Sequence, residues 1–335
     1  MNRSQAVFSE SHAVFCTTTS CEASDSTIDC TKASVSGIFL ESASSVTTKS
    51  INNKIPIKII VGATASGKSS FALSLAQKNE SVIINADSQQ IYSDLRILTA
   101  RPSPAEEAMV PHKLYGVLAA SENCSAGWWQ THAKMEIDWA RSQGIQPIIV
   151  GGTGLYIKAL TSGIAEMPDV PEAIRAQATS DYDEMGKESF SDRLRAIDPA
   201  FFERLKVYDK QRLVRAYEVW LGSGKSLSWW QAQELNPPYP AEEIEIIKIE
   251  LPREEIYKRC NERFLKMIDE GALDEVQQLM AQNLPENLPI MKTIGVRELA
   301  AYLRGETSLE QAIEKCQIAT RNYAKRQMTW FRHQI

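Results

Sequence analysis

Short runs of apolar, often β-branched residues recur along the chain and are separated by longer stretches of mixed polarity. Four runs have the character of strands: IPIKIIV (55–61), SVIIN (81–85), PIIV (147–150) and EIEIIKIEL (243–251). The intervening stretches are helical in pattern. Strands that alternate with helices in this way indicate a parallel sheet covered by helices on both faces. The predicted fold class is therefore α/β.

Two segments depart from this alternation. Residues 1–54 are dominated by Ser and Thr and contain few large apolar residues, which predicts a disordered extension. Residues 167–244 begin and end with proline clusters and hold charged helical patterns without a clear strand, which predicts an inserted all-helical domain. The core would then comprise residues 55–166 and 245–335, and from Pro252 onward it is predicted to be helical, with breaks at Gly271, at 285–289 and at Gly305.

The composition indicates the cellular compartment of the protein but does not identify its activity. A net charge of −5 over 335 residues argues against nonspecific coating of nucleic acid, although a local basic surface remains compatible with it. Six scattered cysteines form no CxxC pair, and no apolar run has the length of a membrane span. We expect a cytoplasmic protein with free thiols and no membrane contact.

A phosphate-binding pattern, Gly62-x4-Gly67-Lys68-Ser69, follows the first predicted strand and opens a predicted helix. Glycines let backbone N–H groups converge on phosphate oxygens, and the helix N-terminus adds favourable potential. Lys68 can bring a cation to the terminal phosphate, and the Ser69 hydroxyl can hold Mg²⁺. The fold is thus predicted to resemble the P-loop nucleoside triphosphatases.

Asp87 stands two residues past the second predicted strand, at the carboxyl edge where α/β proteins bind ligands. It could cap a following helix, serve as a kinase-like base or metal ligand, or act as a general base for an amine. A second glycine loop, Gly151-Gly152-Thr153, follows the third strand; the glycines would permit a tight turn, and Thr153 would either cap a helix or lie near Asp87.

Arg263 lies within an apolar helical stripe formed by Ile256, Cys260 and Met267. A guanidinium directed toward the core needs an anion. The partner would be either a carboxylate such as Asp87, in a buried ion pair, or a bound phosphate.

The C-terminal helix carries a basic and aromatic cluster: Lys315, Arg321, Tyr323, Lys325, Arg326, Trp330, Phe331 and Arg332. Basic residues recur in DKQRLVRAY (209–217) and MKTIGVREL (291–299). Each cluster alone is typical of a solvated helix face, but together they favour a surface for a polyanion.

Six motifs in order, GATASGKS, INADSQQIY, VGGTGLYIKAL, DKQRLVRAYE, KTIGVREL and AKRQMTWFR, span about residues 57–332. This set resembles the tRNA dimethylallyltransferases, also called tRNA isopentenyltransferases. Eukaryotic relatives add a zinc finger beyond the core, and this sequence reaches Ile335 without one, so the resemblance favours the bacterial type or an organellar form. It implies transfer of a dimethylallyl group from dimethylallyl diphosphate to N6 of the adenosine 3′ of the anticodon, in tRNAs that read codons beginning with U.

The resemblance also implies roles for individual residues. Asp87 would be the general base, Thr153 would contact the flipped-out adenosine, and Lys68 and Arg263 would hold the diphosphate, with Mg²⁺ near Ser69. Diphosphate contacts would come from Gly62, Ala63, Thr64, Ala65, Ser66, Gly67, Lys68, Ser69 and Arg263. Contacts with the tRNA anticodon stem-loop would come from Asp87, Ser88, Gln89, Gln90, Thr153, Arg175, Gln211, Arg212, Leu213, Val214, Arg215, Lys292, Thr293, Ile294, Gly295, Val296, Arg297, Lys325, Arg326, Gln327, Trp330 and Arg332.

We expect the protein to act as a monomer. Three alternatives compete with tRNA prenylation: a small-molecule kinase that uses the loop to bind ATP, an adenylate isopentenyltransferase acting on free nucleotides, and a non-enzymatic RNA-binding protein. The kinase does not need the basic, tryptophan-bearing terminus, and the RNA-binding protein does not need the phosphate loop.

Overall fold

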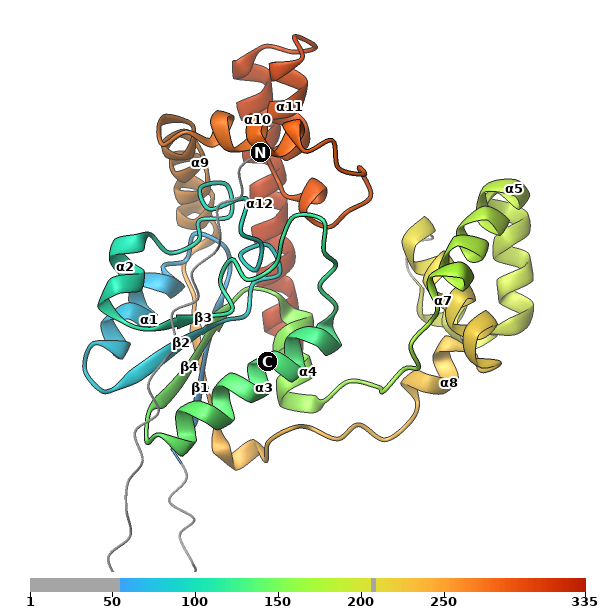
Figure 1. The fold of residues 1–335 in the computed structure, drawn as a ribbon, viewed down its shortest axis with the longest axis horizontal. Helices are drawn as coiled ribbons and strands as arrows, with labels where there is room; N and C mark the ends of the chain where they lie inside the picture. The colour runs from blue at the N-terminus through green and yellow to red at the C-terminus, as the bar shows by residue number, and fades with distance from the viewer. Residues whose placement is uncertain (1–54, 206–208) are drawn as a thin grey trace, which may run out of the picture. The chain divides into compact units, whose positions relative to one another are not determined.

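The computed structural model of the protein describes residues 55–205 and 209–335 (Figure 1). The disorder predicted for residues 1–54 falls outside this range. A parallel sheet of five strands lies at the centre of the α/β part, in the order β3-β2-β4-β1-β5. The strands are β1 (Ile57–Gly62), β2 (Ser81–Asn85), β3 (His112–Lys113), β4 (Gln146–Gly151) and β5 (Ile244–Ile249). The predicted α/β class and all four predicted strands are confirmed; β3 was missed because two residues carry no periodic signal.

Alternate residues of the strands enter two separate cores, as the period of two requires. Ile59 packs with the helices α3 (Ala126–Ser142), α4 (Gly154–Ser162) and α12 (Leu309–Gln334). Ile60, on the opposite face, packs with α1 (Lys68–Ala76). The sheet is therefore covered on both sides, and the short helix α2 (Pro104–Met109) adds to the α1 side through Val110 at its end.

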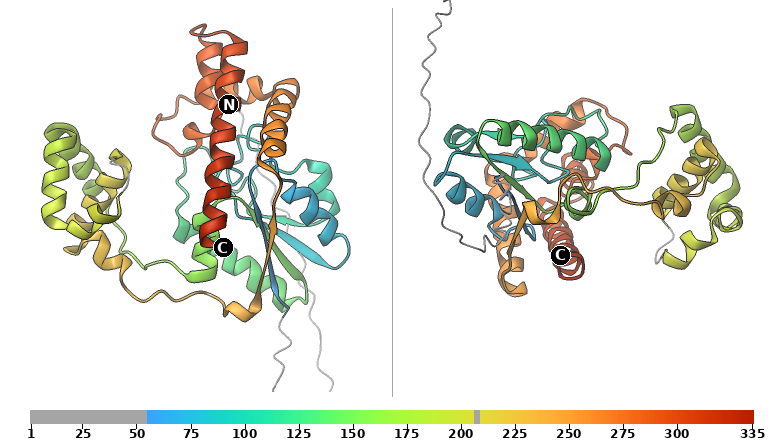
Figure 2. Two further views of the ribbon diagram at one scale, coloured as in Figure 1. Left: turned by 180° about the vertical axis from the view of Figure 1, so that it is seen from behind. Right: turned by 90° about the horizontal axis from the view of Figure 1, so that it is seen from below.

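The C-terminal part of the chain is helical, as predicted. It contains α9 (Arg253–Asp269), α10 (Ala272–Ala281), the 3-10 turn η2 (Ile290–Lys292), α11 (Val296–Leu303) and α12. The break after α9 occurs at Gly271, whose φ of 105° is open to glycine but strained for other residues. Figure 2 shows α12 running beside the sheet and α9, so the last helix lies along the part of the molecule that carries the phosphate loop.

Residues between α4 and β5 form a group of helices: α5 (Glu172–Ile197), α6 (Pro199–Arg204), α7 (Lys210–Ser223), α8 (Leu227–Gln231) and the 3-10 turn η1 (Ala241–Glu243). The helices α5 to α8 share a hydrophobic cluster of their own, centred on Phe190, Leu213 and Tyr217. On the return to β5, the hydroxyl of Tyr239 donates to Asp138 on α3 over 2.8 Å. The return segment is thereby tied to α3.

Within the described ranges, no helix is both long and apolar enough to cross a membrane. Three cysteines in these ranges, Cys124, Cys260 and Cys316, are free thiols.

Candidate active site

Three loops meet at the carboxyl edge of the sheet. The phosphate loop leaves β1, the segment of Asp87 leaves β2, and the second glycine loop leaves β4. Since β4 lies between β1 and β2, the glycine loop is placed between the phosphate loop and Asp87. Parallel strands thus bring together residues that are far apart in sequence.

The phosphate loop has a tightly defined backbone. Ala65 and Gly67 both have positive φ, 62° and 90°, and the loop closes as Lys68 Nζ donates to the carbonyl oxygen of Ala63 over 2.8 Å. A Cβ on Gly62 would lie 2.6 Å from the carbonyl oxygen of Ile249, so only glycine fits there. The buried hydroxyl of Ser66 has no hydrogen-bond partner among the described residues, which leaves a polar atom available inside the loop.

Two cations converge on this loop. Burial lowers the pKa of Lys68 to about 8, an effect that the charge of Asp87 opposes and that of Arg263 reinforces. Burial also lowers the pKa of Arg263. Cations that have lost water without gaining a carboxylate are stabilised by a bound anion, so both observations favour a phosphate group here.

Arg263 extends from α9 to the phosphate loop, and its Nη2 donates a hydrogen bond to Thr64 Oγ1 over 2.5 Å. Within the described part of the chain it forms no salt bridge, so the interpretation as a buried ion pair with Asp87 is wrong. The cation in the apolar stripe is accounted for by the phosphate loop that it faces.

Asp87 begins a turn rather than a helix. Its Oδ1 accepts from the backbone N–H of Gln89 over 2.9 Å, and its own N–H donates to Asn85 Oδ1 over 2.8 Å. The next helix, α2, starts only at Pro104, so the helix-cap interpretation is wrong. The half-buried carboxylate is held by its neighbours at the end of β2.

The second glycine loop is shaped by close packing. A Cβ on Gly151 would lie 2.1 Å from the carbonyl oxygen of Ala86, and one on Gly154 would lie 2.5 Å from the ring of Trp330. The sequence predicts a tight turn at Gly151 and Gly152, but neither has a positive φ. A Cβ on Gly152 would lie 2.2 Å from Gln327 Nε2, so close packing accounts for both glycines. Thr153 makes no side-chain cap to α4; its Oγ1 accepts instead from the N–H of Ser88 over 2.9 Å.

Gln327 of α12 joins the two loops. Its Oε1 accepts from the N–H of Thr64 over 2.7 Å, and its Nε2 donates to the carbonyl oxygen of Gly152 over 2.9 Å. The side chain is buried. One amide therefore satisfies a backbone donor of the phosphate loop and a backbone acceptor of the glycine loop.

Two cavities flank the Asp87 segment. One of about 250 Å³ is lined by Thr64, Asp87 and Arg263, together with apolar side chains of Leu98, Phe264, Met267 and Ile294. The other, of about 300 Å³, is lined by Gly152, Thr153 and Trp330. Ser88, Tyr323 and Arg326 line both. A charged end and an apolar wall in one cavity suit a ligand that has both characters.

Tyr323 lines both cavities and was not among the residues singled out as site residues. Burial raises its pKa, and the charge of Asp87 contributes further in the same direction. The same carboxylate contributes to the raised pKa of Tyr115, which is likewise due first to burial. The aromatic cluster of the C-terminal helix was the only signal that could have identified Tyr323 from sequence.

Most of the residues implied as tRNA contacts can be described by the cavities that they line and by their exposure. Asp87 to Gln89, Thr153, Lys292 to Ile294, Arg326, Gln327 and Trp330 line the two cavities. Several implied contacts are exposed cations away from these cavities: Arg175, Arg297, Lys325 and Arg332. Five of the implied contacts have buried side chains: Leu213, Val214, Thr293, Val296 and Gln327. Two of these, Thr293 and Gln327, are among the cavity-lining residues. Thr293 donates to Gln89 Oε1 over 2.6 Å, so its part is to hold the Asp87 segment.

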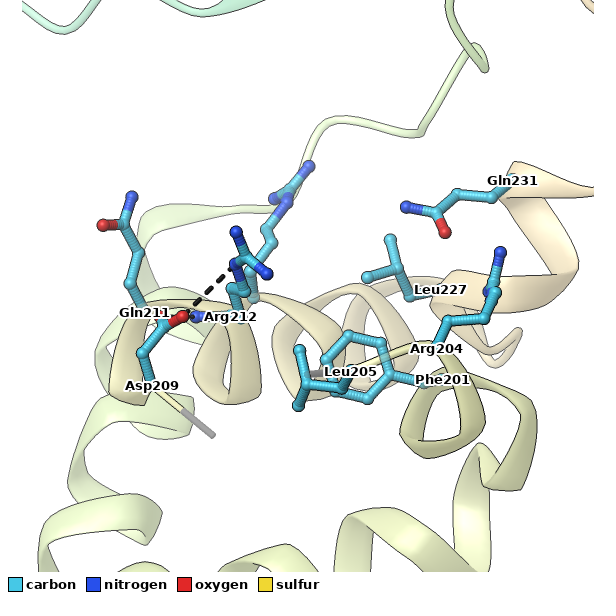
Figure 3. Close-up of a pocket in the computed structure, with 9 residues that line it drawn as sticks. Phe201, Arg204, Leu205, Asp209, Gln211, Arg212, Leu227 and Gln231 are labelled. Carbon is cyan, nitrogen blue, oxygen red and sulfur yellow. Dashed lines mark hydrogen bonds and ion pairs between the residues drawn. The ribbon is translucent and has the colours of Figure 1, made fainter. Parts of the chain in front are cut away.

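A further cavity, of about 920 Å³, lies among the helices α6 to α8 (Figure 3). Arg212, Arg215 and Gln211 from α7 and Arg204 and Gln231 from the neighbouring helices surround an apolar floor of Phe201, Leu205 and Leu227. Arg212 pairs with Asp209 over 3.2 Å, and both side chains are exposed. Three arginines around one hollow provide a surface for phosphate groups.

The donor set for Mg²⁺ is incomplete without a phosphate ligand. Within the described ranges, no group of three or more His, Cys, Asp or Glu side chains could hold a metal. Ser69, in the first turn of α1, offers an exposed hydroxyl beside the phosphate loop. Mg²⁺ commonly takes one or two protein oxygens and completes its shell with phosphate oxygens and water, and the residues present fit that mode.

Comparison with known proteins identifies the family. The IPP transferase model matches residues 90–334, and the isopentenyl transferase model matches residues 55–115. A tRNA dimethylallyltransferase of Rhodospirillum centenum is 48% identical over 280 residues, which cover 84% of this chain and 89% of that protein. The corresponding protein of Zymomonas mobilis is 45% identical over 281 residues, covering 84% and 89%.

Solved structures agree. The tRNA isopentenylpyrophosphate transferase of Bacillus halodurans is similar with a TM-score of 0.60 and 31% identity, over 84% of this chain and 88% of that one. A eukaryotic dimethylallyltransferase acting on tRNA gives a TM-score of 0.69 and 26% identity, over 82% and 69%. The fold therefore belongs to a known architecture, and the chain is a member of the tRNA dimethylallyltransferase family, with close bacterial relatives.

Proposed function

We propose that the protein transfers a dimethylallyl group from dimethylallyl diphosphate to N6 of the adenosine that lies 3′ of the anticodon, in tRNAs reading codons that begin with U. Family membership supports the activity. The observation that carries the site assignment is the convergence of Lys68, Arg263 and Asp87 at one edge of the sheet. Arg263 and Asp87 also line a cavity that has an apolar wall.

In this reaction N6 forms a bond to C1 of the dimethylallyl group as the bond from C1 to the diphosphate oxygen breaks. The lone pair of N6 is delocalised into the adenine ring, so the amine is a weak nucleophile. Asp87 accepts the N6 proton as the new bond forms. The carboxylate is oriented for this by its turn, in which only Oδ1 is engaged with Gln89.

The departing diphosphate receives the charge that develops during the reaction. Lys68 and Arg263 lie where they can stabilise it, together with the N–H groups at the start of α1. Mg²⁺ bound near Ser69 would supply additional charge neutralisation on the phosphate oxygens. The presence of Mg²⁺ remains a prediction, as do the monomeric state and the cytoplasmic location of the protein.

The acceptor has to leave its base stack to enter a cavity of this kind. We assign RNA binding to the exposed cations of α12, to Lys292 and Arg297, and to the arginine-lined cavity of α6 to α8. The separate hydrophobic cluster of α5 to α8 supports the proposal that residues 167–244 form an inserted helical domain.

An anticodon stem-loop tests the assignment. The full-length protein is incubated with dimethylallyl diphosphate and a stem-loop carrying the adenosine, and mass spectrometry follows the RNA. A gain of one prenyl unit, lost when guanosine replaces the adenosine, is expected. A phosphate gain with ATP as donor would instead support the kinase. Prenylation of free AMP, ADP or ATP at a comparable rate would support the adenylate isopentenyltransferase.

A further inference from the structure

We infer that Gln327 is a positioning residue that keeps the donor-binding and acceptor-binding loops in register through its side-chain amide. The inference rests on the proposed function for its kinetic consequence, but the contacts themselves do not depend on it. Gln327 does not face the solvent, and its amide is engaged by backbone atoms on both sides.

The two contacts fix the orientation of the amide. The oxygen must face the N–H of Thr64, and the nitrogen must face the carbonyl oxygen of Gly152. Rotation by 180° would set a donor against a donor and an acceptor against an acceptor. Because both partners are backbone atoms, a side-chain substitution at Thr64 or Gly152 leaves the N–H and the carbonyl oxygen in place.

Each contact leads to one half of the site. Thr64 accepts the hydrogen bond from Arg263, so the amide holds the residue that receives the diphosphate-facing guanidinium. Gly152 precedes Thr153, whose hydroxyl holds the N–H of Ser88, the residue next to Asp87. Gln327 thereby connects the anion site and the base through two short chains of contacts.

The space around the amide is closely fitted. A Cβ on Gly152 would lie 2.2 Å from Gln327 Nε2, whereas the nearest atom outside Gln327, the carbonyl oxygen of Gly62, would be 3.6 Å away. Gly152→Ala therefore conflicts with the amide and with little else. Shortening Gln327 to alanine removes the obstacle, so the two substitutions should be coupled.

The experiment compares Gln327→Ala, Gln327→Glu, Gly152→Ala and the double variant Gly152→Ala/Gln327→Ala in the full-length protein. Gln317→Ala is the matched control, because Gln317 lies on the same helix and donates to the carbonyl oxygen of Asn261, outside the site. Readouts are hydrogen exchange of the segment 62–67, stem-loop affinity, and kcat and KM for the donor and for the RNA.

For Gln327→Ala we expect the Thr64 amide to exchange faster and kcat to fall by about tenfold to hundredfold, as misplacement of reacting groups by about 1 Å produces. RNA affinity should be unchanged, and Gln317→Ala should match the parent protein. Gly152→Ala alone should be as damaging as Gln327→Ala or more so, and the double variant should be no worse than Gln327→Ala.

Several results would overturn the inference. Weaker RNA binding with an unchanged kcat would make Gln327 an RNA contact. Unchanged hydrogen exchange at the Thr64 amide would show that the hydrogen bond to Gln327 does not hold the phosphate loop in place. If the losses of kcat in Gly152→Ala and Gln327→Ala add up in the double variant, the two residues act independently, contrary to the inference. Gln327→Glu preserves side-chain size but sets an oxygen against the carbonyl oxygen of Gly152, so its kcat should also fall, and a parent-like kcat would show that the hydrogen bond donated to Gly152 is not used. Because hydrogen exchange needs no turnover, absence of prenyl transfer in the parent protein would refute the proposed function without deciding this inference.

Discussion

Arg263 on α9 donates a hydrogen bond to the hydroxyl of Thr64 in the phosphate loop, 199 positions earlier in the chain. A cation from the C-terminal half of the protein thus faces a loop that follows the first strand. Burial lowers the pKa of both Arg263 and Lys68, and the nearby charge of Asp87 does not offset this effect for either cation.

Arg263→Gln should therefore weaken the use of the donor. We expect kcat/KM for dimethylallyl diphosphate to fall by about 10²- to 10³-fold, the loss typical of removing one group that stabilises a developing anion. Steady-state kinetics at saturating stem-loop measure it. Arg259→Gln is the control, since Arg259 lies on the same helix but is exposed and pairs with Glu255 over 2.6 Å. Equal losses in both variants would contradict the role of Arg263.

Asp87→Asn keeps an acceptor for the N–H of Gln89 and so preserves the turn. It removes the proton acceptor, and kcat should fall by about 10²- to 10⁴-fold. Stem-loop affinity, measured by filter binding or fluorescence anisotropy, should be retained. Asp169→Asn, at an exposed carboxylate, should leave turnover as it was. Retained turnover in the Asp87 variant would exclude it as the general base.

Lys68 should link stability to pH. Its pKa in the folded protein is about 8 and lies below the 10.5 of an ordinary lysine, so the unfolded chain binds more protons between these values and stability rises with pH across that window. Below pH 8 the folded protein bears the full cost of the buried cation. Lys68→Met should raise the free energy of unfolding at pH 7 by on the order of 1 to 3 kcal/mol, while it abolishes donor binding.

Urea unfolding at pH 7 and at pH 9.5 measures this difference, which should shrink at the higher pH. Lys78→Met is the control at an exposed position just after α1. A Lys68 variant less stable than the parent protein at pH 7 would mean that Lys68 is stabilised by its surroundings even without ligand.

Gly151→Ala should damage both stability and activity. The added Cβ would lie 2.1 Å from the backbone of Ala86, which cannot move without displacing the end of β2 and Asp87. We expect a loss of about 2 kcal/mol or more in the free energy of unfolding, as overpacking against rigid atoms produces. Gly127→Ala in α3, where the Cβ meets nothing closer than 3.7 Å, should be neutral by thermal unfolding. A tolerated Gly151→Ala would show that the edge of the sheet is not closely packed.

Arg212→Gln tests the cavity of α6 to α8. If its guanidinium contacts a phosphate, the stem-loop Kd should rise and the slope of log K against log salt should decrease by about one. The control is Lys187→Gln, an exposed cation on α5 that does not line the cavity. An identical salt dependence for both variants would remove this cavity from the RNA-binding surface.

Much of this arrangement was predictable from local patterns. Asp87 could be placed because parallel strands end at one edge, and Arg263 was conspicuous as a cation in an apolar stripe. The role of Gln327 in joining the two loops could not be predicted. A polar residue in a largely polar helix gives no periodic signal, and its partners are backbone atoms of loops that are distant in sequence. Gly151 and Gly152 were assigned to a tight turn, whereas close packing against Ala86 and Gln327 explains them.

The position of Gln327 also has a consequence for synthesis of the protein. Phosphate loop, base and glycine loop are all complete once translation has passed Thr153, yet the amide that joins them is added 175 residues after Gly152. A nascent or prematurely terminated chain can therefore possess every loop of the site while still lacking the contact that aligns them. Competence would arise late, when α12 emerges from the ribosome and packs against the sheet.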